Sequence, residues 1–437
     1  MINRLILLLS IFSLSTRLNA QQVNFSEYDL ENGLHVILHK DKTAPVVAVS
    51  VMYHVGSKDE NPERTGFAHF FEHLLFEGSK NIKRGDFMNI VSSNGGQNNA
   101  NTSQDRTFYY EIFPSNQLEL GLWLESERML HPKIEDIGVK TQREVVKEEK
   151  RMRIDNQPYG KFTENIFYHL FRGNPYSWQP IGSMEHLDAA TLEEFIAFFN
   201  KYYVPNNAVL TIAGDIDLEK TKAMVAKYFN EVPKGKILQR DVVQVKPVVK
   251  QIVDTVYDAN IQIPAIFAAY RIPGMKNREN KILDMISSIL SGGGSSRLSM
   301  KMVDEKRTAL QVSAFNYTLE DYGVYITLAL PNNNTPLDDL LKDIDAEVSR
   351  LRTDLISESE FKKLQNKFEN DYVSSNSSMI GVAENLSNGY TFHNKNTNYL
   401  NQQLEQIRSI TPEEIREVAK KYLRNDQRVV LYYLPKK

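Results

Sequence analysis

The chain has 437 residues, which is too many for one ordinary hydrophobic core and predicts two domains of about 200 residues each. Its composition, with 41% hydrophobic, 10% aromatic and 24% charged residues, is typical of a globular protein and excludes a largely disordered chain. The formal net charge of −3 gives no electrostatic reason to expect nucleic acid or a strongly anionic membrane surface as a partner.

The first twenty residues differ in composition from the rest of the chain. Arg4 is followed by an apolar run from Leu5 to Leu14, and Ala20 offers a small-residue exit. This pattern predicts a cleaved signal peptide over residues 1–20 and a periplasmic or secreted mature protein, with a retained N-terminal anchor as the alternative. No later stretch approaches the roughly 18 apolar residues of a spanning helix, so no integral membrane span is expected in the mature chain.

Two strands and a helix with metal-binding side chains are predicted before residue 80. The runs His35–His39 and Val46–His54 predict the strands, and the helix after them carries the motif HFFEH at 69–73. At about 100° per residue, His69 and His73 lie about 40° apart and one turn removed, close enough to share a metal ion. Glu72 lies at the edge of such a site, where it can take a proton from water at the metal. The alternative is that the two histidines are ordinary core or surface residues.

The segment Gly95–Ser103 combines two glycines with small polar residues. The glycines predict a turn, and the polar residues after it predict a backbone edge that is open to an extended peptide. An ordinary polar hairpin is the alternative.

A third metal ligand is expected on the helix predicted over residues 138–153. A catalytic zinc site takes three protein ligands and leaves one position for water, and a chain without cysteine must supply nitrogen and oxygen donors. Gln142, Val145, Val146 and Glu149 follow an i, i+3, i+4, i+7 pattern, which places Glu149 in a semi-apolar stripe. A buried carboxylate needs a partner, and a zinc ion would be one. The alternative is a salt bridge on an amphipathic helix.

Two similar segments indicate that the chain contains a duplication. Thr191 and Glu194 predict a helix with a capping box that leads into a strand over Ala208–Ala213. Thr411, which lies 220 residues after Thr191, and Glu414 repeat this arrangement before a strand at residues 428–433. The repeat predicts two homologous halves, each an α+β domain.

The second half is expected to lack the metal chemistry of the first. It has a predicted strand over Ile261–Arg271 and a helix over Lys281–Leu290 that corresponds to the motif helix. At an offset of about 215, Asp284, Ser287 and Ser288 take the places of the three motif residues.

The residues between the halves predict a connector. Residues 233–250 contain several lysines and two prolines and show no clear periodicity. The expected organisation is therefore a metal-binding domain over residues 21–235, a linker over 236–250 and a homologous second domain over 251–437.

Residues 66–79, which read GFAHFFEHLLFEGS, closely resemble the signature of the inverted-zincin peptidases, the family of pitrilysin, insulysin and mitochondrial processing peptidase. The resemblance extends over nearly the whole mature chain. It includes Glu149, which lies 76 residues after His73, as the third ligand does in that family. By this resemblance, His69, His73 and Glu149 bind one Zn²⁺ per chain and Glu72 is the general base. Gln142 stands where some members carry a glutamate that supports the third ligand.

The same resemblance implies a fold and an activity. It implies two homologous α+β domains, each a mainly antiparallel sheet packed with helices, that together form half of a clamshell. The activity would be zinc-dependent endopeptidase hydrolysis of peptides or unfolded segments, with Asn99 and Ala100 on the edge segment binding the peptide substrate. The alternative function is a non-catalytic peptide-binding or assembly subunit of a larger peptidase-like complex.

A partner chain is also expected. Members of the family use an Arg and a Tyr from a second-half domain to hold the substrate, whereas the equivalent strand here, residues 323–328, contains no Arg. The resemblance therefore implies a homologous partner subunit in a heterodimer, or a second copy of this chain in a homodimer.

Overall fold

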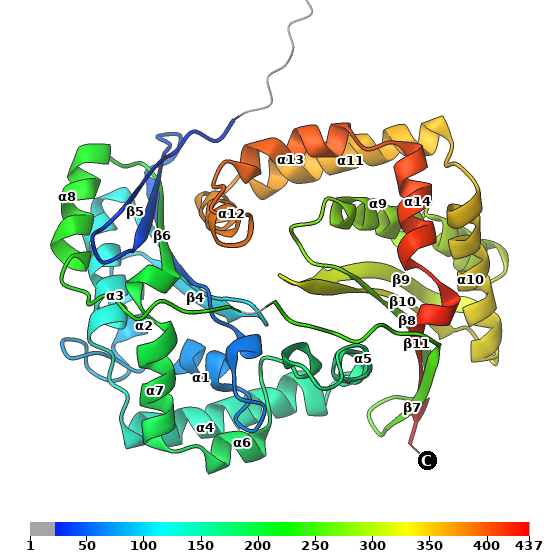
Figure 1. The fold of residues 1–437 in the computed structure, drawn as a ribbon, viewed down its shortest axis with the longest axis horizontal. Coiled ribbons are helices and arrows are strands. Elements are labelled where there is room, and N and C mark those ends of the chain that lie inside the picture. The colour runs from blue at the N-terminus through cyan, green and yellow to red at the C-terminus, as the bar shows by residue number, and fades with distance from the viewer. Residues whose placement is uncertain (1–21, 241, 437) are drawn as a thin grey trace, which may run out of the picture.

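The computed structural model describes residues 22–240 and 242–436, and the predicted signal peptide lies outside them. The chain forms two β-sheets that lie side by side, each packed with helices (Figure 1). Among the described residues, no helix has both the length and the apolar character that crossing a membrane requires.

The first sheet has six strands in the order β1-β2-β6-β3-β5-β4. Their bounds are β1 (Ser26–Asp29), β2 (His35–Lys40), β3 (Val46–Tyr53), β4 (Gln97–Thr102), β5 (Thr107–Pro114) and β6 (Ala208–Gly214). All neighbours pair antiparallel except β2 and β6, which are parallel. The strands predicted around residues 35, 46 and 208 are confirmed, and β4 lies at the edge of the sheet.

The second sheet repeats this topology with five strands in the order β7-β11-β8-β10-β9. Their bounds are β7 (Ile252–Asp258), β8 (Ala265–Pro273), β9 (Ala309–Thr318), β10 (Tyr322–Pro331) and β11 (Arg428–Pro435). Here too one pair, β7 and β11, is parallel and the others are antiparallel. The match between β2-β6-β3-β5-β4 and the second sheet confirms the prediction of two homologous α+β halves.

One strand boundary was predicted wrongly. Strand β8 begins at Ala265, four residues later than the predicted start at Ile261. The cause is Pro264, which has no backbone N–H to donate to a ladder and whose ring restricts the residue before it.

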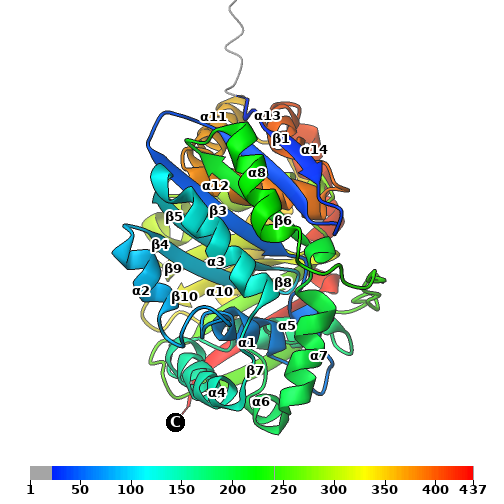
Figure 2. The ribbon, with the colours of Figure 1, turned by 90° about the vertical axis from the view of Figure 1, so that its left-hand side faces the viewer.

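Helices cover the sheets on both faces. Those of the first half are α1 (Phe67–Leu74), α2 (Phe87–Ser93), α3 (Leu118–Leu130), α4 (Asp136–Lys150), α5 (Phe162–Leu170), α6 (Met184–Ala189), α7 (Leu192–Tyr202) and α8 (Leu218–Phe229). Those of the second half are α9 (Glu279–Ser291), α10 (Leu337–Thr353), α11 (Glu358–Ser375), α12 (Met379–Phe392), α13 (Tyr399–Arg408) and α14 (Pro412–Tyr422). Helices α3 and α8 lie across the outer face of the first sheet (Figure 2). Between α8 and β7, the described residues 233–250 contain no helix or strand, and the boundaries of the two domains stay a prediction.

Each half also contributes a helix to the sheet of the other half. Helix α5 packs through Phe167 against the second sheet, in a cluster that includes Phe267 and Leu431. Helix α12 packs on the first sheet, where Ser387 shares a buried hydrogen bond of 2.8 Å with Thr211 of β6. Figure 1 shows α12 between the two sheets. This exchange buries apolar surface of both halves in common cores, so the halves are fixed to one another.

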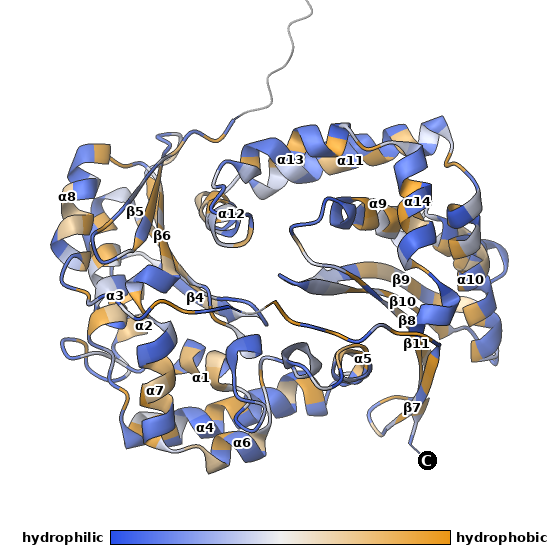
Figure 3. Cartoon of the chain, in the orientation of Figure 1, coloured by the Kyte–Doolittle hydropathy of each residue, from blue (hydrophilic) through white to orange (hydrophobic). Residues whose placement is uncertain are grey.

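The two predicted capping boxes are confirmed. The Thr191 and Thr411 side chains each accept a hydrogen bond from the backbone of a glutamate three residues later, and that glutamate accepts one in return. Each capped helix leads through a short 3₁₀ turn into the strand with one parallel neighbour, β6 or β11. Both strands are largely hydrophobic (Figure 3).

A buried ionic network also joins the two halves. The ammonium group of Lys58 lies 2.9 Å from Asp105 and 2.5 Å from Glu320, with Asp321 at 3.7 Å. The imidazole of His54 lies 2.8 Å from the same Glu320 carboxylate. Glu320 and Asp321 belong to the turn between β9 and β10, so the network anchors the second sheet to the first half.

The stability of this contact is expected to depend on pH. Burial alone would raise the pKa of Glu320, but the hydrogen bond from His54 and the charges of His54 and Lys58 outweigh burial and hold that pKa well below its ordinary value. The charged group of Lys276, at 4.0 Å, also faces Glu320. A carboxyl with a lowered folded-state pKa stabilises the fold above its unfolded pKa of about 4.3, and this contribution is lost as the pH falls toward the folded-state pKa.

The free energy of unfolding of wild type should therefore exceed that of Glu320→Gln most clearly above pH 5, and the difference should shrink as the pH falls to 3. Denaturant titrations at several pH values measure it. Glu231→Gln serves as control, because Glu231 is exposed. If the difference in unfolding free energy between wild type and Glu320→Gln does not change with pH, the assignment of a lowered pKa to Glu320 is contradicted.

Candidate active site

The motif helix α1 has one aromatic face and one polar face. Phe67 and Phe70 stack on Phe195 of α7, with ring centroids 4.5 and 4.6 Å apart. Because an α-helix turns about 100° per residue, burying this face leaves His69, Glu72 and His73 on the other side. The sequence order of the motif thus fixes which side chains point away from the core.

The start of α1 is held by backbone contacts. Gly66, directly before the helix, has φ of 100°, a conformation that glycine adopts without strain. The carboxylate of Glu60 accepts hydrogen bonds of 2.9 Å from the backbone N–H groups of Gly66 and Ala68. The hydroxyl of Tyr109 donates to the carbonyl of Phe71 at 2.8 Å. The bonds to Glu60 satisfy free N–H groups at the helix start, and the bond from Tyr109 adds a contact near the helix end, so that together they fix the orientation of the helix that carries the motif.

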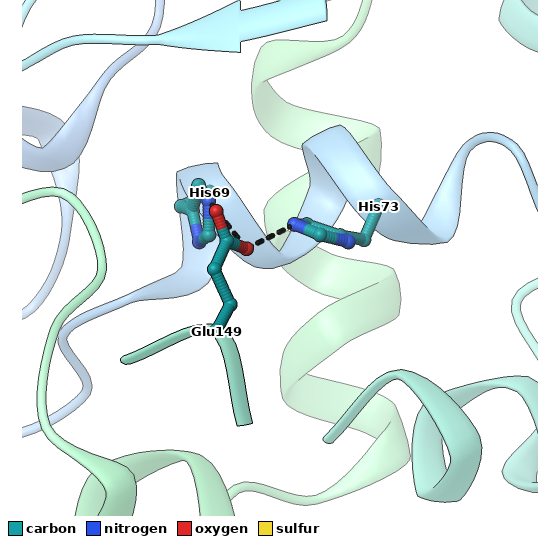
Figure 4. A group of neighbouring side chains, drawn as sticks. All are labelled: His69, His73 and Glu149. Carbon is teal, nitrogen blue, oxygen red and sulfur yellow. Dashed lines mark ion pairs between the residues drawn. The ribbon is translucent and has the colours of Figure 1, made fainter. Parts of the chain in front are cut away.

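The three side chains predicted as metal ligands lie together. Their donor atoms all lie within 4.8 Å of one another. The Oε2 atom of Glu149, on α4, is 2.9 Å from Nε2 of His73 and 3.5 Å from Nε2 of His69 (Figure 4). Two side chains one turn apart on α1 and a third from a crossing helix provide the number of protein donors that a catalytic zinc site uses.

The electrostatics of this group suit a metal cation. Burial lowers the pKa of His69 to about 4, so its imidazole is neutral at pH 7 and has a lone pair to offer. The contact with His73 lowers the pKa of Glu149, which keeps that carboxylate ionised. Oε2 of Glu149 is buried, and although Nε2 of His73 lies 2.9 Å away, no described residue donates a well-aligned hydrogen bond to it. Two imidazoles and such a carboxylate oxygen match the donors that zinc takes in catalytic sites.

Glu72 lies beside the group but outside it. Its carboxylate accepts a hydrogen bond of 2.6 Å from the hydroxyl of Thr102, the last residue of β4. Burial raises the pKa of Glu72, and the bond from Thr102 opposes that rise. A carboxyl with a raised pKa, held by one bond and facing the same cavity as the metal-binding side chains, is suited to accepting and returning a proton.

The open edge of β4 forms one wall of this site. A cavity of about 450 Å³ extends from the polar face of α1 to the strand. Its lining comprises His69, Glu72, His73, Phe76, Met88, Asn98, Asn99, Ala100, Asn101, Thr102, Glu149 and Arg153. Asn99 and Ala100 therefore lie where predicted, on an edge strand next to the motif. Strand β4 pairs with β5 on one side, and on its other side it has no partner strand among the described residues.

Two features of the predicted α4 helix need correction. Val145 is 43% exposed, so it does not belong to the buried stripe. At 100° per residue, Val146 and Glu149 lie within about 40° of Gln142, whereas Val145 lies about 60° to one side. The regular helix also ends at Lys150, and residues Arg151–Asp155 form a π-helical turn.

Gln142 does not contact the metal-binding group directly. Its amide nitrogen donates to Glu77, which also pairs with Arg84. Gln142 thus supports the end of the motif segment, and no hydrogen bond between it and Glu149 is found in the described chain.

Thr102 and Arg153 also face the site, although neither was predicted as a site residue. Thr102 lay within the predicted edge segment, but its bond to Glu72 depends on the register between β4 and β5. Arg153 lies four residues after Glu149, a spacing that places two side chains on one side of a helix, and its Nη1 atom lies 2.9 Å from Oε1 of Glu149.

In the second half, the described residues contain no comparable group of three metal-binding side chains. Asp284 lies on α9, the counterpart of α1, and burial raises its pKa.

The repeated halves and the HxxEH helix with its third carboxylate are those of a class of metallopeptidases. Residues 35–181 match the family model of Insulinase (Peptidase family M16), and residues 189–368 match that of the Peptidase M16 inactive domain. The zinc protease PqqE of Helicobacter pylori is 30% identical over 412 residues, which cover 93% of this chain and 92% of that protein. The chain therefore belongs to peptidase family M16, as its motif predicted.

Other relatives and solved structures support this assignment, although not all of them have the same length. An uncharacterized zinc protease of Rickettsia felis is 23% identical, with 90% of this chain and 91% of that protein covered. The crystal structure of a protease from Helicobacter pylori matches with a TM-score of 0.90 and 29% identity over 95% of this chain and 100% of that one. The periplasmic protease PqqL from Escherichia coli shares the fold, with 19% identity and a TM-score of 0.77. The match covers 95% of this chain and 48% of PqqL.

Proposed function

We propose that this chain is a zinc-dependent endopeptidase that hydrolyses peptides or unfolded segments, with His69, His73 and Glu149 as the zinc ligands and Glu72 as the general base. The observation that carries the proposal is the position of Glu72. It lies outside the three-residue group, yet it faces the same cavity and is held by Thr102. A purely structural metal site would not require a second carboxyl in this position.

The residues of the chain would divide the reaction between them. Zinc, when bound, polarises the scissile carbonyl and makes the attacking water more acidic. Glu72 accepts a proton from that water and later passes it to the leaving amine. Thr102 orients the Glu72 carboxylate through its hydroxyl. The outer backbone edge at Asn99 and Ala100, where the Ala100 N–H donates to Oδ1 of Asn99 in the absence of a peptide, pairs with an extended substrate, so that binding tolerates many side chains.

The proposal includes export and a partner. The predicted signal peptide supports a periplasmic or secreted location. The absence of an Arg from β10, together with a fold that corresponds to about half of PqqL, supports assembly with a homologous subunit or with a second copy of this chain. The rival is a non-catalytic peptide-binding or assembly subunit.

Quenched fluorescent peptides test the activity. The mature chain, alone and mixed with a homologue from the same organism, should cleave them. Dialysis against a chelator should abolish cleavage, and one equivalent of zinc per chain should restore it, because the ligand set is complete within one chain. If the assembly binds zinc and cleaves no peptide, the rival function is correct.

A further inference from the structure

We propose that Arg153 makes this site selective for peptides that carry a carboxylate close to the scissile bond. The inference rests on the proposed peptidase function and extends it to a class of substrate. It starts from a residue that the ligand set and the general base do not use.

The Arg153 side chain makes one ion pair within the site and is otherwise exposed. Its Nη1 atom lies 2.9 Å from Oε1 of Glu149, while the other oxygen of that carboxylate faces His69 and His73. The Arg153 side chain is 76% exposed and lines the cavity. A guanidinium has five N–H donors, so most of them remain available for a second carboxylate.

The neighbouring basic residues do not share this position. Lys150 donates to the carbonyl of Gly182 at 3.0 Å, and Arg151 pairs with Glu148 at 3.0 Å. Neither lines the cavity, so Arg153 is the one Lys or Arg side chain among its described lining residues. Arg153 instead lies one turn after Glu149 and shares its side of the helix.

The charge balance of the cavity favours an anion at Arg153. The charges of Glu72 and Glu149 would offset those of a bound zinc dication, and the other lining residues, such as Phe76 and Met88, are apolar or neutral. Arg153 then leaves a net positive charge on the wall beside Glu149. Arg binds carboxylates through paired N–H groups, which makes the contact selective in geometry as well as in charge.

The distance between Arg153 and the metal-binding group limits where the substrate carboxylate lies. Only the Glu149 carboxylate separates the guanidinium from the two histidines. Since an extended residue spans about 3.3 Å, a carboxylate on Arg153 belongs to a residue within roughly two positions of the scissile bond. It can come from an Asp or Glu side chain or from the C-terminus of the peptide.

Paired peptides distinguish these sources. Each pair differs by Glu or Gln at one of the two positions on either side of the scissile bond, and a further pair differs by a free or amidated C-terminus. Wild type in its active assembly should cleave one acidic peptide with kcat/KM about tenfold above that of its neutral match. In Arg153→Gln this ratio should fall to about one, and in Arg151→Gln it should persist. Because each ratio is taken within one protein, a change in zinc content affects both peptides alike.

Charge reversal and binding complete the test. Arg153→Glu should prefer a Lys peptide over its Gln match. An acid-to-neutral ratio that is equal in wild type and Arg153→Gln overturns the inference. If wild type cleaves nothing, fluorescence anisotropy of the same peptides decides: a preference that depends on Arg153 rejects the peptidase function but keeps the selectivity, and equal binding by both proteins rejects the selectivity.

Discussion

Replacement of Glu72 by Gln is expected to lower kcat for peptide hydrolysis by about 10²–10⁴-fold, the usual contribution of a positioned general acid or base. Glutamine keeps the size of the side chain, and its carbonyl oxygen can still accept the hydrogen bond from Thr102. It cannot take a proton from water. The loss should therefore appear in kcat, with zinc content and the free energy of unfolding close to those of wild type.

The measurement is steady-state cleavage of a quenched peptide at saturating substrate, with zinc determined in the same samples. Glu63→Gln is a matched control, since Glu63 is an exposed residue shortly before α1. Full activity in Glu72→Gln would show that another group is the base. Lost zinc in this variant would mean that Glu72 belongs to the metal-binding group.

The features that followed most directly from the sequence are local ones. The spacing within HFFEH fixes both faces of α1, and the capping boxes at Thr191 and Thr411 fix two helix starts. Because the second of these segments repeats the first, the sequence predicted that the two halves would have the same fold. Glu149 was reached by spacing along α4 together with the resemblance to a known family.

The features that could not be predicted depend on contacts between distant segments. The bond between Thr102 and Glu72 requires the strand register of β4, and nothing near Thr102 in sequence encodes it. The exchange of α5 and α12 between the halves depends on packing between each helix and a sheet that is distant in sequence. Arg153 is different, because its spacing of four residues from Glu149 does indicate an ion pair on one helix face, and only its place in the cavity lining depends on distant segments.

Replacement of Glu149 by Gln is expected to weaken zinc binding by at least about 100-fold. Loss of an outer partner of a metal ligand typically costs 10–100-fold in affinity, and Glu149 would itself be a ligand and the only anionic one in the group. Gln lacks the negative charge, and its amide oxygen is a weaker donor for zinc. Glu148→Gln is the matched control, because the neighbouring Glu148 is exposed and pairs with Arg151 instead.

Competition with a chromophoric chelator measures the affinity, and thermal unfolding provides a second readout. Zinc at 100 times its dissociation constant adds about 2.7 kcal/mol to the stability of a protein that binds it only when folded. Added zinc should therefore raise the unfolding temperature of wild type and of Glu148→Gln, and at the same concentration it should raise that of Glu149→Gln much less. Equal zinc affinity in all three proteins would remove Glu149 from the ligand set, and with it the assignment of a site with three protein ligands.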